Sequence, residues 1–166
     1  SKDQDDEESE MGVVAQGIAK AAELLSGKYN WVITNVPYLS LKKHNDILRD
    51  YCKKYFSEAK SDLATVFLER CLELCYEDGT CCIVMPQNWL FLGSYKKLRE
   101  KLLRSESWHI VARLGEGGFE SSAAAGAFIV LIIISHSPSF GRRIIRGFDI
   151  SVPRTASEKA VLLLNA

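Results

Sequence analysis

A tetrapeptide that directly follows an apolar run carries the residue types with the clearest chemistry in this chain. It reads Asn35-Val36-Pro37-Tyr38 and stands behind residues 29–34. The amide oxygen of Asn35 can accept a hydrogen bond from an exocyclic amino group. Pro37 fixes the local backbone, and the ring of Tyr38 can stack on a flat base. The set predicts a site that holds a flat group by its amino nitrogen.

Alternating helical and strand patterns predict the elements that position this tetrapeptide. Helices are expected over 13–25, 44–56, 61–77 and 95–103, and strands over 30–34, 80–85, 109–114 and 127–134. Ser61 is the expected N-cap of the third helix, and Asp78-Gly79 its expected end. The order predicts an α/β layered domain with a mostly parallel sheet. The short connection between the last two strands predicts that they pair antiparallel.

Two loops are expected to leave strands at the carboxyl edge of this sheet, where ligands bind in α/β proteins. Residues 35–38 follow the first strand, and residues 86–91 follow the second. The second strand is a continuous apolar run, which is typical of a strand buried on both faces. The two loops are therefore expected to line one crevice.

The composition indicates one domain or a piece of one, because the chain has 166 residues, 47% of them apolar. Its 21 basic and 21 acidic residues balance, but the acidic residues 1–10 are expected to be disordered. The five cysteines fit neither a disulfide framework nor a zinc pattern, so reduced core thiols, no metal site and a cytoplasmic protein are expected. The longest apolar run, 127–134, is far shorter than the roughly 20 residues of a membrane span, and the acidic start is unlike a signal peptide.

Four segments in order resemble the N6-adenine DNA methyltransferases: residues 29–38, 59–70, 85–92 and 98–103. The tetrapeptide is similar to the family motif Asn-Pro-Pro-Tyr. The resemblance covers roughly residues 29–134 and extends to the large methylases of the BREX phage-defence type and to type IIG restriction–modification enzymes. It implies a partial Rossmann-like methyltransferase fold, roughly strands four to seven of a seven-stranded mixed sheet with flanking helices.

The resemblance also implies a reaction, in which S-adenosylmethionine donates a methyl group to N6 of an adenine flipped out of double-stranded DNA. The catalytic set would be Asn35, Val36, Pro37 and Tyr38. The Asn35 side-chain oxygen and the Val36 carbonyl would accept the two amino hydrogens as the nitrogen becomes tetrahedral. Asn35 would also contact the donor, whose main glycine-rich binding motif is absent from this chain.

Further residues receive roles from their position in the resemblance. Trp89 and Phe119 are expected near the target base together with Tyr38. The alternatives are a hydrophobic plug for Trp89 and an aromatic anchor of a mobile loop for Phe119. Contacts to the DNA backbone are expected from four basic residues, with an ordinary solvated surface as the alternative: Lys42, Lys43, Arg142 and Arg143.

Val36 departs from the resemblance, because the family usually has a proline there. A valine still presents its carbonyl, but the loop loses rigidity. Two other interpretations stay open, and Val36 supports only the second of them. The same fold can methylate an RNA base or a protein glutamine amide, since a flat group is held in the same way. The chain can also be a degenerate, non-catalytic module that binds DNA or a partner.

The domain organisation follows from the same resemblance. Residues 11–135 are expected to form the C-terminal half of the catalytic domain, and 136–166 a link toward a target-recognition region. The donor-binding half and the recognition domain are expected in a longer polypeptide, so that the chain alone is inactive. The strand over residues 29–34 then has an open edge, covered either by the helix over 13–25 or by a second copy in a homodimer.

Overall fold

The computed structural model describes residues 2–119, 126–137 and 144–166. Its helices are α1 (Lys2–Ser26), α2 (Asp46–Tyr55), α3 (Leu63–Glu73), α4 (Lys96–Ser105) and α5 (Ala156–Leu164). Its strands are β1 (Tyr29–Asn35), β2 (Cys75–Pro86), β3 (Ser107–Gly115), β4 (Ile129–Ser135) and β5 (Arg146–Asp149). Three short 3-10 helices stand in the loops: η1 (Leu41–Lys43), η2 (Gln87–Leu90) and η3 (Gly93–Tyr95). This order confirms the predicted alternation of helices and strands.

The five strands form one mixed sheet in the order β1-β2-β4-β3-β5. β1 runs parallel to β2, and β3 runs parallel to β5. β4 runs antiparallel to both of its neighbours, β2 and β3. The predicted antiparallel pairing of β3 with β4 is therefore confirmed. The carboxyl ends of the four other strands lie at one edge of the sheet.

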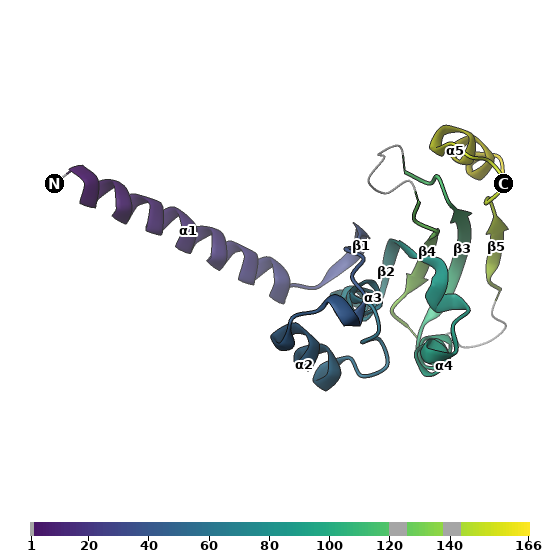
Figure 1. The fold of residues 1–166 in the computed structure, drawn as a ribbon, viewed down its shortest axis with the longest axis horizontal. Coiled ribbons are helices and arrows are strands. Elements are labelled where there is room, and N and C mark those ends of the chain that lie inside the picture. The colour runs from purple at the N-terminus through teal and green to yellow at the C-terminus, as the bar shows by residue number, and fades with distance from the viewer. Residues whose placement is uncertain (1, 120–125, 138–143) are drawn as a thin grey trace.

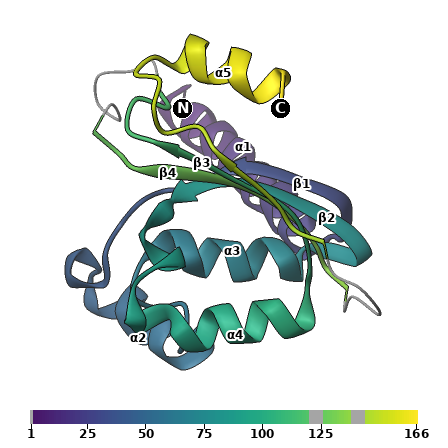
Figure 2. The same cartoon turned by 90° about the vertical axis from the view of Figure 1, so that its right-hand side faces the viewer.

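The helices are distributed unevenly around the sheet. Helices α2, α3 and α4 lie on one face, whereas α5 lies on the other side (Figure 2). Helix α1 extends away from the sheet (Figure 1), and its apolar side chains Val14, Ile18 and Leu25 are exposed. Coverage by this helix, one of the two alternatives expected for the open edge of β1, is therefore wrong.

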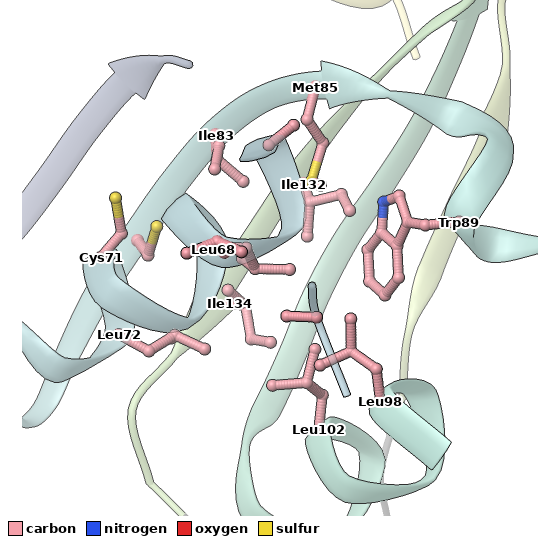
Figure 3. Close-up of a cluster of buried hydrophobic side chains, with 14 of the residues drawn as sticks. Leu68, Cys71, Leu72, Ile83, Met85, Trp89, Leu98, Leu102, Ile132 and Ile134 are labelled. Carbon is pink, nitrogen blue, oxygen red and sulfur yellow. The ribbon is translucent and has the colours of Figure 1, made fainter. Parts of the chain in front are cut away.

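The core lies between the sheet and helices α3 and α4 (Figure 3). Its buried apolar side chains include Leu68, Cys71, Leu72, Ile83, Met85, Leu98, Leu102, Ile132 and Ile134. Along β2, Cys81, Ile83 and Met85 are fully buried, whereas Cys82 and Val84 are half-buried. The apolar run of β2 is thus not buried on both faces as expected, because α3 and α4 cover one face alone.

The cysteines are all free thiols, and all except Cys82 are buried. The Cys75 thiol donates to the carbonyl of Cys71 at 3.3 Å. Within residues 2–119, 126–137 and 144–166, no cluster of His, Cys, Asp or Glu side chains is suited to a metal ion. Over the same ranges, no helix has both the length and the apolar character of a membrane span.

Helix α1 begins earlier than the sequence pattern indicated. It starts at Lys2 and includes the acidic segment that was expected to be disordered. Two physical reasons favour helix there. Acidic residues near a helix N-terminus interact favourably with the helix dipole, and Glu, Gln and Lys are good helix formers.

Two further boundaries differ from the sequence expectation, and one strand was not predicted. Helix α3 takes Asp62 rather than Ser61 as its N-cap, because the Asp62 side chain accepts from the backbone of Ala64. β2 begins at Cys75 and runs through Asp78 and Gly79, which form a bulge instead of ending a helix. Asp78 has a φ of 64°, and a Cβ on Gly79 would lie 2.8 Å from the Tyr29 carbonyl. β5 was not predicted, because it is short and mostly exposed.

Candidate active site

The tetrapeptide leaves the sheet at the carboxyl end of β1, which ends at Asn35. Asn35 and Pro37 are exposed. Val36 is only 4% exposed and belongs to the core, and Tyr38 packs against that core. The Val36 side chain therefore anchors the loop, while the Asn35 amide stays accessible.

Tyr38 and Asn35 interact directly. The Tyr38 hydroxyl donates to the side-chain oxygen of Asn35 at 3.1 Å. Burial raises the pKa of Tyr38 to about 12, so the phenol is a neutral donor at neutral pH. An amide oxygen has two lone pairs, and this bond uses one of them. The other stays available for a ligand, with the amide orientation fixed by the tyrosine.

The loop after the tetrapeptide is tied to the start of α3. Ser40 and Asp62 form an isolated antiparallel bridge, and the Leu41 amide donates to the Ser61 carbonyl at 3.0 Å. These contacts, with the buried Val36, restrain the loop by tertiary structure. The rigidity that a proline at this position would supply is thus replaced in part.

The second loop leaves β2 at the same edge, after Pro86. A cavity of about 260 Å³ lies between it and the loop that follows the tetrapeptide. Its lining residues are Ser40, Ser61, Asp62, Ala64, Thr65, Met85, Pro86, Asn88, Trp89, Leu92, Ser94 and Tyr95. The predicted crevice between residues 35–38 and residues 86–91 is not observed, because residues 35–38 do not line this cavity. Its other wall comes instead from Ser40 and from the start of α3.

Trp89 lies in the core and not on the surface of this edge. Its side chain is 2% exposed, and its ring centroid lies 5.9 Å from that of Trp108. Figure 3 shows it among Met85, Ile132 and Leu98. The indole nitrogen is buried and has no hydrogen-bond partner in the described part of the chain. This placement favours the hydrophobic plug over a contact with a base, whereas Phe91 is 64% exposed.

The glycine turn after β3 starts at the same level of the sheet as the loop after β2. Pro86 and Gly115 both pair with Ile129, from opposite sides of β4. β3 stands three strands from β1, or ~14 Å at ~4.8 Å per strand. Phe119 is half-buried. Because it follows the end of β3, it lies at the same edge of the sheet as Asn35, with β2 and β4 between β1 and β3.

The basic residues expected on DNA have different placements. Lys42 and Lys43 are exposed in η1, beside the tetrapeptide. Arg142 and Arg143 lie outside the described residues. A role for Arg113 was not predicted, although a charge near the end of an apolar strand was a usable signal.

Arg113 connects the ends of two strands. Its Nε donates to the Gln87 side chain at 3.3 Å, and its Nη1 lies 3.0 Å from the Asp149 carboxylate. Hydrogen bonds from Ser151, with support from Arg113, lower the pKa of Asp149. The carboxyl edge is thus linked by polar contacts from the loop after β2 to the end of β5.

Comparison with known proteins places this arrangement in a family. The sequence pattern of the Eco57I restriction-modification methylases matches residues 2–118. The chain belongs to this family. It is 36% identical over 107 residues to the adenine-specific methyltransferase PglX of Lacticaseibacillus casei (strain Zhang). It is 37% identical over 98 residues to the adenine-specific methyltransferase BrxX of Escherichia coli O9:H4 (strain HS). These matches cover 63% and 59% of this chain but only 9% and 8% of those relatives.

Solved structures share the fold of this Eco57I-family chain. A type I restriction-modification methyltransferase subunit from Streptococcus thermophilus matches with a TM-score of 0.57 at 20% identity, over 84% of this chain and 31% of that one. A Listeria monocytogenes protein assigned to the class I S-adenosylmethionine-dependent methyltransferases gives 0.60 at 16% identity, over 85% and 42%. DrdV in its DNA complex gives 0.64 at 15% identity, over 92% and 18%. The expected fold class, part of a Rossmann-like methyltransferase fold, is confirmed.

Proposed function

We propose that this Eco57I-family chain is the catalytic part of a DNA methyltransferase that methylates N6 of a flipped-out adenine, in restriction–modification or phage defence. The observation that carries the proposal is the exposed Asn35 amide at the carboxyl end of β1, oriented by Tyr38 at 3.1 Å. The names of PglX and BrxX as adenine-specific methyltransferases support adenine as the target.

The proposed role of the tetrapeptide is to change the geometry of the amino group. The lone pair of an adenine amino nitrogen is delocalised into the ring, which makes the nitrogen a poor nucleophile. The free lone pair of the Asn35 oxygen and the Val36 carbonyl accept its two hydrogens and favour a tetrahedral nitrogen. The ring of Tyr38 stacks on the base. After transfer the extra proton on nitrogen leaves to water, so no basic side chain is required.

S-adenosylmethionine, when bound, supplies an electrophilic methyl group. Asn35 suits a donor contact because its amide is exposed and β1 is an edge strand of the sheet. Trp31 and Ile33 on this strand are 63% and 76% exposed, so the surface beside Asn35 is apolar. We assign the other donor contacts and target recognition to further segments of a longer polypeptide. The match to PglX, which covers only 9% of that relative's length, supports this assignment. The 166-residue chain alone is then inactive.

The proposed partner is double-stranded DNA, with Lys42 and Lys43 on its phosphates. Arg142 and Arg143 keep the same proposed role. Trp89 and Phe119 were expected at the base, and the burial of Trp89 leaves Phe119 as the better candidate. The free thiols support a reducing compartment such as the cytoplasm.

A labelling assay tests the proposal with the full-length protein. Methyl-labelled S-adenosylmethionine is offered with adenine-containing duplex DNA, with RNA and with a protein extract. Label in N6-methyladenine of duplex DNA is the expected result. Label confined to RNA or protein would favour the same fold with another substrate. No label anywhere would favour the non-catalytic module, and Val36→Pro would then show whether the family's proline restores transfer.

A further inference from the structure

Helix α5 carries a buried lysine that the proposed reaction does not use. Lys159 is 2% exposed. Its ammonium donates to the carbonyls of Leu114 at 2.6 Å, Ile150 at 3.0 Å and Ser151 at 3.5 Å. A lysine has three donor hydrogens and no acceptor, so three carbonyls match its capacity. Lysine is rarely buried without such partners, because removing its charge from water is costly.

These carbonyls come from two segments that meet at the carboxyl edge of the sheet. Leu114 stands near the end of β3, directly before the glycine turn, and residues 150 and 151 follow β5. The segments also touch through their backbones. A Cβ on Gly117 would lie 2.2 Å from the Arg154 carbonyl oxygen. One on Gly115 would lie 2.9 Å from the Cβ of Ser151.

Residues 151–154 therefore restrict the conformation of the turn. Gly115 and Gly117 have φ values of 65° and 74°, a region that glycine adopts without strain. Close approach and positive φ occur at the same two glycines. The position of the turn thus depends on where the segment after β5 is held.

That segment is held from both of its ends. Before it, the Asp149 carboxylate accepts from the Ser151 amide at 3.1 Å and from the Ser151 hydroxyl at 2.6 Å. After it, helix α5 starts with a capping box between Thr155 and Glu158. Lys159 then reaches back from the helix to carbonyls of both segments. Ile150 also donates from its backbone amide to the carbonyl of Arg113 at 2.8 Å. Lys159 adds α5 to this contact between β3 and the segment after β5.

We infer that Lys159 is a positioning residue, which fixes the glycine turn after β3 and thereby places Phe119 for contact with the target base. This inference rests on the proposed function, which gives Phe119 its ligand. Phe119 stands two residues beyond Gly117, so a shift of the turn moves its ring. The competing explanation is that Lys159 only tethers α5 to the sheet. That explanation predicts a loss of stability without a specific effect on the turn.

The experiment compares three variants of the full-length protein. Lys159→Met keeps the length of the side chain but removes the ammonium, and Lys159→Arg keeps a cationic donor. Lys97→Met, at an exposed lysine of α4, is the matched control. The measurements are amide hydrogen exchange, and kcat and KM for methyl transfer to duplex DNA.

The expected result is a local effect in Lys159→Met. Exchange at residues 114–118 rises ~10-fold while β1 and β2 keep their protection. The value of kcat falls ~10-fold, with the KM for S-adenosylmethionine unchanged, because the base and not the donor is misplaced. Lys159→Arg recovers most of kcat, and Lys97→Met behaves as the wild type.

Three results would overturn the inference. The first is unchanged exchange at residues 114–118 in Lys159→Met. The second is an equal rise throughout the sheet, as for a tether alone. The third is faster exchange at the turn with wild-type kcat. If the wild-type protein methylates no DNA, the proposed function fails, and the exchange measurement still decides whether Lys159 orients the turn.

Discussion

At the scale of single residues, neighbouring residues of the tetrapeptide have different roles. Val36 is buried and anchors the loop, whereas Asn35 is exposed and oriented by Tyr38. A valine in place of the family's proline is compatible with this division, because burial restrains the backbone from the core side. The residue that presents the acceptor and the residues that hold it can therefore be altered separately.

Replacing Asn35 tests the acceptor. In the full-length protein, Asn35→Ala is expected to lower the rate of methyl transfer by about 10²- to 10³-fold, as for the loss of one aligned polar group. The free energy of unfolding should change by less than about 0.5 kcal/mol, because the side chain is exposed. Kinetics and urea denaturation measure the two quantities. Asn165→Ala, at the end of α5, is the control, and an equal rate in both variants would refute the acceptor role.

Tyr38 gives a prediction for alkaline pH. Its pKa is about 12 in the folded chain, against about 10 for an unperturbed tyrosine. The folded state thus favours the protonated phenol, so this contribution to stability is complete below about pH 10 and disappears toward about pH 12. Urea denaturation across that range should show a larger loss of stability for the wild type than for Tyr38→Phe. Parallel curves would argue against the raised pKa.

At the scale of elements, the loop after β2 packs into the core next to the site. η2 turns the Trp89 side chain into the core between the sheet and α4, while the chain continues to the exposed Phe91. The segment therefore fixes the wall of the cavity between the two loops by burying one aromatic ring. The stability of this wall should depend on the volume of that ring.

Truncating Trp89 tests this packing. Trp89→Ala is expected to lower the free energy of unfolding by about 3–5 kcal/mol, through lost burial and a cavity against Trp108. Trp89→Phe should cost less, because most of the volume remains. Chemical denaturation measures both, with Phe91→Ala as the exposed control. A stable Trp89→Ala variant that loses only DNA binding would show that Trp89 contacts the base after all.

At the scale of the whole molecule, the β1 edge of the sheet is uncovered. β1 is one of the two edge strands, and α1 leaves its Trp31 and Ile33 exposed. An open edge of this kind pairs readily with another chain. We therefore propose that the isolated 166-residue chain forms dimers through β1, at the place that further chain segments occupy in the longer polypeptide.

Sedimentation of the isolated chain tests this dimer. The wild type should associate with rising concentration, whereas Ile33→Lys should stay monomeric, because a charge on an edge strand blocks pairing. Ile47→Lys, at a residue of α2 that is 84% exposed, is the matched control and should associate like the wild type. A wild type that remains a monomer at all concentrations would refute the dimer.

The sequence by itself determined the alternation of elements, the strand that carries the tetrapeptide, and the exit of the two loops at one edge of the sheet. These features depend on local signals: apolar periodicity, capping residues, and the rule that parallel strands end at one edge. Local signals failed at Asp78-Gly79, where a turn-like pair lies inside a strand, and at residues 2–10, which are helical although their composition suggested disorder.

Only the tertiary structure decided which residues far apart in the chain meet. It paired β5 with β3, packed Trp89 on Trp108, linked Gln87 to Arg113, and brought Lys159 to the carbonyl of Leu114. Such contacts depend on strand order and register, and a local pattern does not encode them. In the sequence, Lys159 cannot be told from an exposed helix lysine, because the carbonyls that accept from its ammonium belong to other elements.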